Sequence, residues 1–143
     1  MTNPTRRLVL GGLIVSAVPG AAIAQTPEFA VGQEWDVRDL PEGHAIIGLI
    51  DEINGSRVIH ASVSYNGLTE LGQPPDSGIT HGHLAFTEEA FAASVIRLVD
   101  ASAYIPESFQ IDYERWRANP QVINAPIAQL VRYMHSAALR RTL

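Results

Sequence analysis

Early in the chain, hydrophobic and polar residues alternate in a way that predicts short β-strands. Trp35 and Val37 alternate with charged neighbours, a pattern typical of a half-buried edge strand. Residues 45–50 are nearly all apolar, which indicates a central strand covered on both faces. The Asn-Gly pair at 54–55 favours a type I′ turn, and residues 58–66 then alternate cleanly. We therefore expect a three-stranded antiparallel meander.

A long loop and a first helix are predicted after the meander. Residues 67–82 are rich in Gly, Pro, Ser and Thr, and a connection of this length is often a binding element. Thr87 is a favourable N-cap, and two glutamates follow it at the positive end of the helix dipole. The helix that begins there is predicted to place Phe91, Val95 and Leu98 on its apolar side.

Two further helices are predicted towards the end of the chain. One covers residues 107–118 and stops before an Asn-Pro pair; its aromatic side comprises Phe109, Tyr113 and Trp116. Residues 122–123 are predicted to add a short strand. The last helix begins near Pro126 and runs to about Arg140. Its predicted buried stripe comprises Ile127, Leu130, Val131, Met134 and Ala138. Strands first and helices afterwards indicate an α+β fold.

The first 24 residues have the layout of a cleavable export signal. A polar start ends in Arg6-Arg7, an apolar run follows, and Ala22-Ile23-Ala24 forms an A-x-A cleavage site. The paired arginines and the residues after them resemble the twin-arginine signal family. We expect cleavage after residue 24, a single domain over residues 25–143, and a periplasmic or otherwise exported protein. The general secretory route and an uncleaved anchor are the alternatives.

Charge and cysteine content narrow the classes of partner. The chain of 143 residues has a net charge of −5, and the part after residue 24 carries eight basic and fifteen acidic residues, a net −7. No basic cluster suits nucleic acid or an anionic membrane surface, so neither partner is expected. Cysteine is absent, which excludes disulfides, thiolate metal sites and a cysteine nucleophile.

The part from Phe29 to about Ala138 resembles a group of small bacterial proteins of unknown function. The resemblance is carried by four short motifs along most of this part: Val31-Gly32-x-x-Trp35, Val58-x-His60-x-Ser62-Val63, His83-x-x-Phe86 followed by Ala90, and Tyr113-x-x-Trp116-Arg117. The resemblance implies one α+β domain and brings no activity with it.

Histidines supply the first candidate site. On an extended Thr80–His83 segment, His81 and His83 would project to the same side, and His60 or His44 could approach from the sheet. Two or three neutral imidazoles can bind Zn²⁺, Cu²⁺ or Ni²⁺. The alternative is that these histidines hydrogen-bond the loop onto the next helix.

A nucleophilic site and a partner-binding patch are also considered. His60 shares a strand face with Ser62 and Ser64, but residues two apart on a strand lie about 7 Å apart, too far for direct activation of a serine. An aromatic and arginine patch is available on the helix at 107–118. Its candidate partner-binding residues are Tyr113, Trp116 and Arg117.

The sequence therefore favours a small exported protein that binds rather than catalyses. The predicted surface is the loop from Gly67 to His83 with the adjoining helix, the partner being a protein or a small molecule, with self-association left open. No cofactor is expected under this hypothesis. The alternative is a protein that binds zinc or copper through His81 and His83, with His60 as a third ligand. A small hydrolase is a remote third hypothesis.

Overall fold

The computed structural model describes residues 27–142, which form an α+β fold. The α+β class is confirmed. The predicted signal segment and its cleavage point lie outside the described residues. Within 27–142 there are five strands, β1 (Glu34–Val37), β2 (His44–Ile53), β3 (Ser56–Asn66), β4 (Gly78–Thr87) and β5 (Val95–Asp100). The same range holds three α-helices, α1 (Glu88–Ser94), α2 (Glu107–Ala118) and α3 (Ile127–Thr142), and the short 3₁₀ turn η2 (Thr69–Leu71).

All five strands belong to one antiparallel sheet in the order β4-β3-β2-β1-β5. The predicted hairpin between β2 and β3 is present, because Asn54 (φ 52°) and Gly55 (φ 82°) both take the left-handed conformation of a type I′ turn. The predicted meander of β1, β2 and β3 forms the middle of the sheet. The sheet has five strands and not only the predicted three, because β4 and β5 pair with the two outer strands of the meander.

The predicted loop is shorter than expected at its far end. Residues 78–82 belong to β4, which pairs with β3 from Gly78 opposite Asn66 to Thr87 opposite Val58. Two glycines in this stretch weaken the strand pattern in the sequence. The connection that remains, residues 67–77, includes η2.

The predicted helix through Leu98 is also wrong in its second half. Thr87 caps α1 as expected, since its Oγ1 accepts from the Ala90 N–H at 3.1 Å. The helix ends at Ser94, and the β-branched run that follows forms β5 against β1. Consequently β1 lies between β2 and β5 and is an interior strand, not the predicted edge strand.

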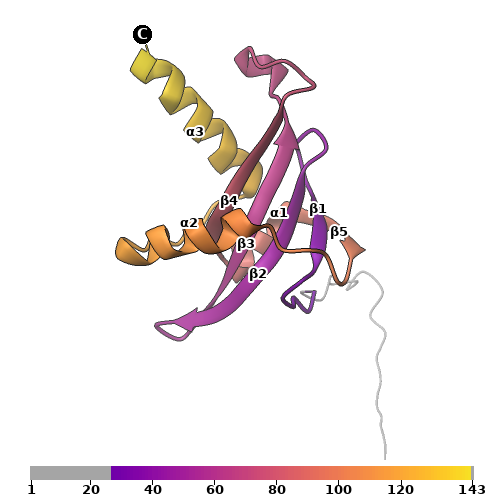
Figure 1. Ribbon diagram of the computed structural model, residues 1–143, viewed down its shortest axis with the longest axis vertical. Coiled ribbons are helices and arrows are strands. Elements are labelled where there is room, and N and C mark those ends of the chain that lie inside the picture. Colours follow the sequence, from indigo (N-terminus) through magenta and orange to yellow (C-terminus); the bar gives the residue numbers. More distant parts are fainter. Residues whose placement is uncertain (1–26, 143) are drawn as a thin grey trace, which may run out of the picture.

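Helices cover both faces of the sheet (Figure 1). On one face, α1 and the first turns of α3 enclose the hydrophobic core, whose most buried members include Ile47, Ile59, Val63, Phe86, Phe91, Ile127 and Val131. On the other face, α2 crosses the strands (Figure 1). Its Phe109 fits over Gly48 of β2, where a Cβ atom would lie 2.5 Å from the ring. We call these the core face and the α2 face.

Both predicted C-terminal helices are present, and α3 is anchored by a buried serine. The Ser94 hydroxyl donates to the Ala90 carbonyl at 2.7 Å and accepts from the Ile127 N–H at 2.9 Å, so α1 supplies the cap of α3. Ala138 is exposed, contrary to the predicted stripe. The predicted strand at 122–123 is a single parallel bridge between Ile123 and Phe86. None of the helices in the described range is long and apolar enough to cross a membrane.

Candidate functional site

His81 and His83 lie on opposite faces of the sheet. Val63 pairs with His81 and Ala61 pairs with Leu84, so β4 has one more residue than β3 between these pairs, a β-bulge at Gly82. The extra residue reverses the alternation. The prediction that the two histidines project to the same side is therefore wrong.

On the α2 face, His83 meets His60 and Asp51. His60 Nδ1 lies 2.8 Å from His83 Nε2, and His60 Nε2 lies 3.3 Å from Asp51 Oδ1. His60 is fully buried and His83 is 8% exposed. We call Asp51, His60 and His83 the His60 cluster. The sequence placed His60 near His83, but as a metal ligand; the structure joins them by a hydrogen bond.

Aromatic rings of α2 cover the His60 cluster. The Trp116 ring lies 4.9 Å from the His60 ring and 5.4 Å from the His83 ring, both edge to face. Tyr113 and Phe109 complete the cover. Two of the three predicted partner-binding residues, Tyr113 and Trp116, thus turn their rings towards the sheet, while Arg117 is exposed and pairs with Glu114 at 3.1 Å. Their role in binding a partner stays a prediction.

Burial keeps the two histidines of the His60 cluster uncharged near neutral pH. Desolvation, followed by the charge of His60, lowers the pKa of His83 from 6.5 to about 4, against a smaller opposing effect of Asp112. Desolvation also lowers the pKa of His60, opposed by its hydrogen bond to Asp51. The cluster is therefore a neutral pair of imidazoles beside a carboxylate.

On the core face, His81 belongs to a second network that the sequence did not reveal. The Tyr65 hydroxyl lies 2.8 Å from His81 Nε2 and 2.6 Å from His135 Nε2. Gln73 Nε2 lies 3.0 Å from His135 Nδ1, and Gln73 Oε1 accepts from the Leu68 N–H at 2.8 Å. We call Tyr65, Gln73, His81 and His135 the Tyr65 network. It ties β3, β4, the 67–77 connection and α3 together.

The direction of each hydrogen bond in the Tyr65 network follows from the Leu68 N–H. That donor fixes the Gln73 amide so that its NH₂ group donates to His135 Nδ1. His135 then carries its hydrogen on Nε2 and donates to the Tyr65 oxygen, and the single Tyr65 hydrogen goes to His81 Nε2. In this arrangement the imidazole nitrogens facing Tyr65 and Gln73 all have hydrogen-bond partners, so they are poorly placed to bind a metal.

Burial favours the neutral forms of Tyr65 and His81. It raises the pKa of Tyr65 to about 12. Burial, followed by the neighbouring His135, lowers the pKa of His81.

Tyr65→Phe is expected to destabilise the protein by about 1–3 kcal/mol, because it leaves the facing nitrogens of His81 and His135 without their shared partner. Urea unfolding measures the change. Tyr104→Phe, at a side chain that is 76% exposed, is the matched control and should be neutral. Equal stabilities of the two variants would contradict the assigned network.

A groove lies beside the edge strand β4, between α2 and α3. It has a volume of about 330 Å³, and its floor includes Leu84 and Ala85. Most of its lining is apolar; the remaining lining residues are His83, Trp116, Asn119, Gln121, Ile123, Leu130, Tyr133 and Met134. The Trp116 indole donates to the Gln121 carbonyl at 2.8 Å, which fixes the ring at the groove wall. A shallower hollow of about 450 Å³ adjoins it and shares His83, Leu84 and Trp116.

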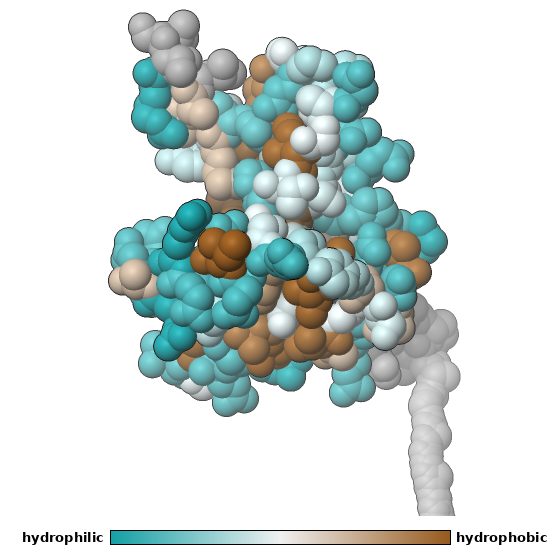
Figure 2. All heavy atoms as spheres, in the orientation of Figure 1, coloured by the Kyte–Doolittle hydropathy of each residue, from teal (hydrophilic) through white to brown (hydrophobic). Residues whose placement is uncertain are grey.

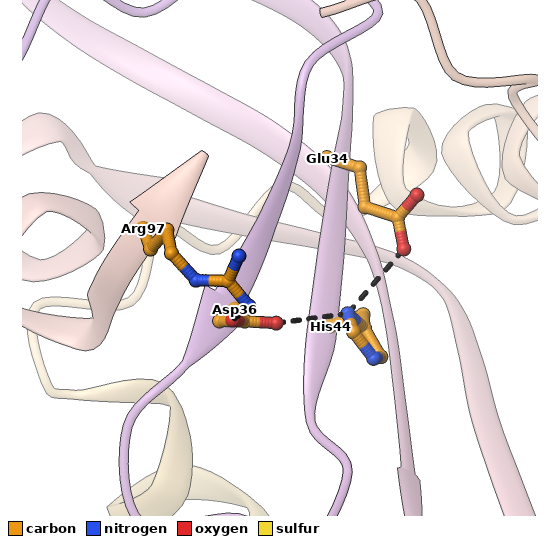
Figure 3. A network of polar contacts seen from close by, with 4 residues as sticks. All are labelled: Glu34, Asp36, His44 and Arg97. Carbon is orange, nitrogen blue, oxygen red and sulfur yellow. Dashed lines mark hydrogen bonds and ion pairs between the residues drawn. The ribbon is translucent and has the colours of Figure 1, made fainter. Parts of the chain in front are cut away.

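His44 lies in a separate polar network on the α2 face (Figure 3). Its Nδ1 atom is 3.3 Å from both Glu34 Oε2 and Asp36 Oδ1, and Arg97 pairs with Asp36 at 2.6 Å. The sequence placed His44 near His83, whereas the structure pairs it with acidic residues of β1.

No group of three or more His, Cys, Asp or Glu side chains within residues 27–142 is arranged to hold a metal ion. The Ser62 hydroxyl donates to the His81 carbonyl at 3.4 Å, away from the His60 ring nitrogens. The geometry thus brings His60 and His83 together. Among the described residues it forms neither the predicted metal-binding triplet nor a serine–histidine pair.

The fold and its sites define an α+β protein with two histidine networks, one on each face of an antiparallel sheet. Comparisons with protein-family models, curated proteins and solved structures found no match to the chain.

Proposed function

We propose that the protein is a non-catalytic binding protein whose ligand occupies the groove between α2 and α3. The observation that carries this proposal is a mostly apolar hollow of about 330 Å³ with a few polar residues in its lining. Small-molecule sites commonly have this size and this lining. The groove also includes His83, the last residue of the predicted loop surface, and Trp116, one of the predicted partner-binding residues.

The lining indicates the chemistry of the ligand. Leu84, Leu130 and Met134 suit an apolar body, and the Trp116 ring suits a flat aromatic group. Among the lining residues, Asn119 and Gln121 have side-chain amides that can each donate and accept a hydrogen bond. A small, largely apolar molecule with one amide, hydroxyl or anionic group fits these features.

The His60 cluster supports binding rather than catalysis. A general base must reach the proton that it removes. His60 is fully buried, and both of its ring nitrogens already face Asp51 and His83. The cluster instead holds β2, β3 and β4 together beneath α2, which positions Trp116 at the groove. A reproducible turnover abolished by one substitution in the cluster would contradict this reading.

Export is part of the same proposal. The pattern of residues 1–24, with paired arginines, an apolar run and an A-x-A site, supports delivery to the periplasm by the twin-arginine route. The expected ligand is then one met outside the cytoplasm. Mass spectrometry of the protein from the exported fraction tests this step, with a chain that begins at Gln25 as the expected result.

Met134→Glu is expected to weaken binding of an apolar aromatic probe, anilinonaphthalene sulfonate, by about tenfold or more, because it places a negative charge in the apolar part of the groove, where that charge also repels the sulfonate of the probe. Titration of probe fluorescence measures the affinity. Ala138→Glu, one turn further along α3 and exposed, is the matched control and should bind as the wild type does.

The Trp116 indole N–H signal in an NMR spectrum locates the probe. It should shift on saturation, since the ring lines the groove. An unchanged signal, or equal binding by the Met134→Glu variant, would contradict the proposal.

A further inference from the structure

The β5 edge of the sheet carries an unusual concentration of exposed apolar side chains. Eight large hydrophobic residues are exposed in the described part of the chain, and five of them lie in β5 or beside it. These five, which we call the β5 patch, are Val31, Ile96, Leu98, Val99 and Tyr104. The Ala103 N–H donates to the Gly32 carbonyl at 2.7 Å, which brings Val31 and Tyr104 to the same edge.

The face in view in Figure 2 is mostly hydrophilic, with a few hydrophobic atoms near its right-hand side, the side on which β5 lies in Figure 1. Ile96 is 58% exposed and Tyr104 is 76% exposed. Apolar residues gathered in this way mark an interaction surface more often than a solvated one.

The opposite edge of the sheet is protected. Along β4, Ile123 donates to the Ala85 carbonyl at 2.8 Å and accepts from the Thr87 N–H at 3.0 Å. At Gly82, α2 also packs against this strand. Covering segments of this kind prevent pairing with another chain. By contrast, β5 has β1 on one side and, among the described elements, no strand on the other.

We infer that β5 pairs in antiparallel fashion with β5 of a second copy of this chain, which joins two sheets into one. Because such a dimer is two-fold symmetric, each strand must be complementary to its own reverse. Charge selects the register: when Leu98 lies opposite Val99 of the second copy, Arg97 lies opposite Asp100 of the second copy, and the same pair recurs across the axis.

The side chains of Arg97 and Asp100 point to the side that this register requires. Arg97 bonds to Asp36, and Asp100 pairs with Glu34, so both project from the α2 face. The extra residue between Leu98 and Asp100 in the β1–β5 pairing accounts for their spacing.

Both charged groups retain capacity for a second partner. The bond to Asp36 uses one of the five N–H groups of Arg97, and the Ser102 N–H uses one oxygen of Asp100. Opposite charges facing each other across paired strands favour this pairing over its alternatives.

The test is the oligomeric state of the full chain as purified. Light scattering during gel filtration should show a dimer that dissociates on dilution. At about 100 μM a dimer with a micromolar Kd is largely formed, so a monomer at that concentration would overturn the inference. Ile96→Lys should raise the Kd at least about tenfold, because it places two like charges at the shared edge. Val122→Lys, at another partly exposed apolar residue, is the matched control and should leave the Kd unchanged.

A second variant keeps the test valid if Ile96→Lys disturbs folding. Asp100→Asn preserves an acceptor for the Ser102 N–H but removes the charge, and it should weaken the dimer several-fold at low salt and much less at high salt. A dimer insensitive to both variants would place the interface elsewhere and overturn the inference.

Hydrogen exchange identifies what occupies the edge. The β5 amides should become protected as the protein concentration rises. Protection of these amides in a monomer would show that the segment before Pro27, or another molecule, covers β5, and would also overturn the inference. Neither result depends on the groove between α2 and α3.

Discussion

Acidification from pH 6.5 to about 4 is expected to lower the free energy of unfolding by about 3 kcal/mol through His83 alone. The sign follows from the lowered pKa. In the unfolded chain His83 takes up a proton below about pH 6.5, but in the folded protein only below about pH 4. Between these values the unfolded state binds more protons, so acid favours unfolding. The loss begins near the upper value and is complete near the lower one.

Two other histidines, His60 and His81, add to this loss of stability in acid. His60 and His81 have pKa values lowered in the same direction, so both add to the acid sensitivity. The carboxylates of Asp51 and Asp112 favour the protonated rings and oppose the effect, but desolvation is the largest cause for each histidine. The net expectation is a protein that is most stable above pH 6.5.

His83→Gln should flatten this pH dependence. Glutamine retains an amide that can hydrogen-bond His60 but does not titrate. Urea unfolding at pH values spanning the window measures the slope for both proteins. Ala138→Gln, which adds the same side chain at an exposed position without a titrating group, is the control and should keep the wild-type slope. Equal slopes for the wild type and His83→Gln would contradict the burial of an uncharged His83.

Gly48→Ala is expected to destabilise the protein by about 2–3 kcal/mol, because its Cβ atom would lie 2.5 Å from the Phe109 ring. The ring cannot move into the sheet, so α2 has to lift. That movement exposes the His60 cluster to water and displaces Trp116 from the groove. Urea unfolding and probe binding should therefore both change.

Two variants separate this steric effect from a general cost of alanine. A Cβ atom at Gly78 meets nothing within 4 Å, so Gly78→Ala should be nearly neutral. Phe109→Ala makes room for the new methyl group, so Gly48→Ala should cost less in that background than in the wild type. Additive effects of the two substitutions would show that Gly48 does not hold α2 through Phe109.

The parts of the fold that could be predicted from sequence are those with local signals. The Asn54-Gly55 turn, the Thr87 cap and the bounds of α2 each depend on residues that are close together in the chain. By contrast, β5 was hidden because its apolar residues also fit a helical stripe. Pairing with β1, about sixty residues earlier, decides the outcome, and such a contact leaves no local pattern.

The candidate site also has a part that could be predicted from sequence and a part that depends on distant contacts. His60 and His83 were selected by residue type, and the structure places them in contact. The Tyr65 network was missed because Gln73 and His135 are 62 residues apart and neither has a distinctive neighbour. A hydrogen-bond network assembled by tertiary packing has no spacing that a sequence can display.

The bulge at Gly82 has a consequence for how this protein can change over evolutionary time. Although His81 and His83 are separated by only one residue in the chain, they project from opposite faces of β4. His81 belongs to the network of Tyr65 and His135, whereas His83 belongs to the cluster of His60 and Asp51. Either histidine can therefore be replaced without removing a hydrogen bond of the other.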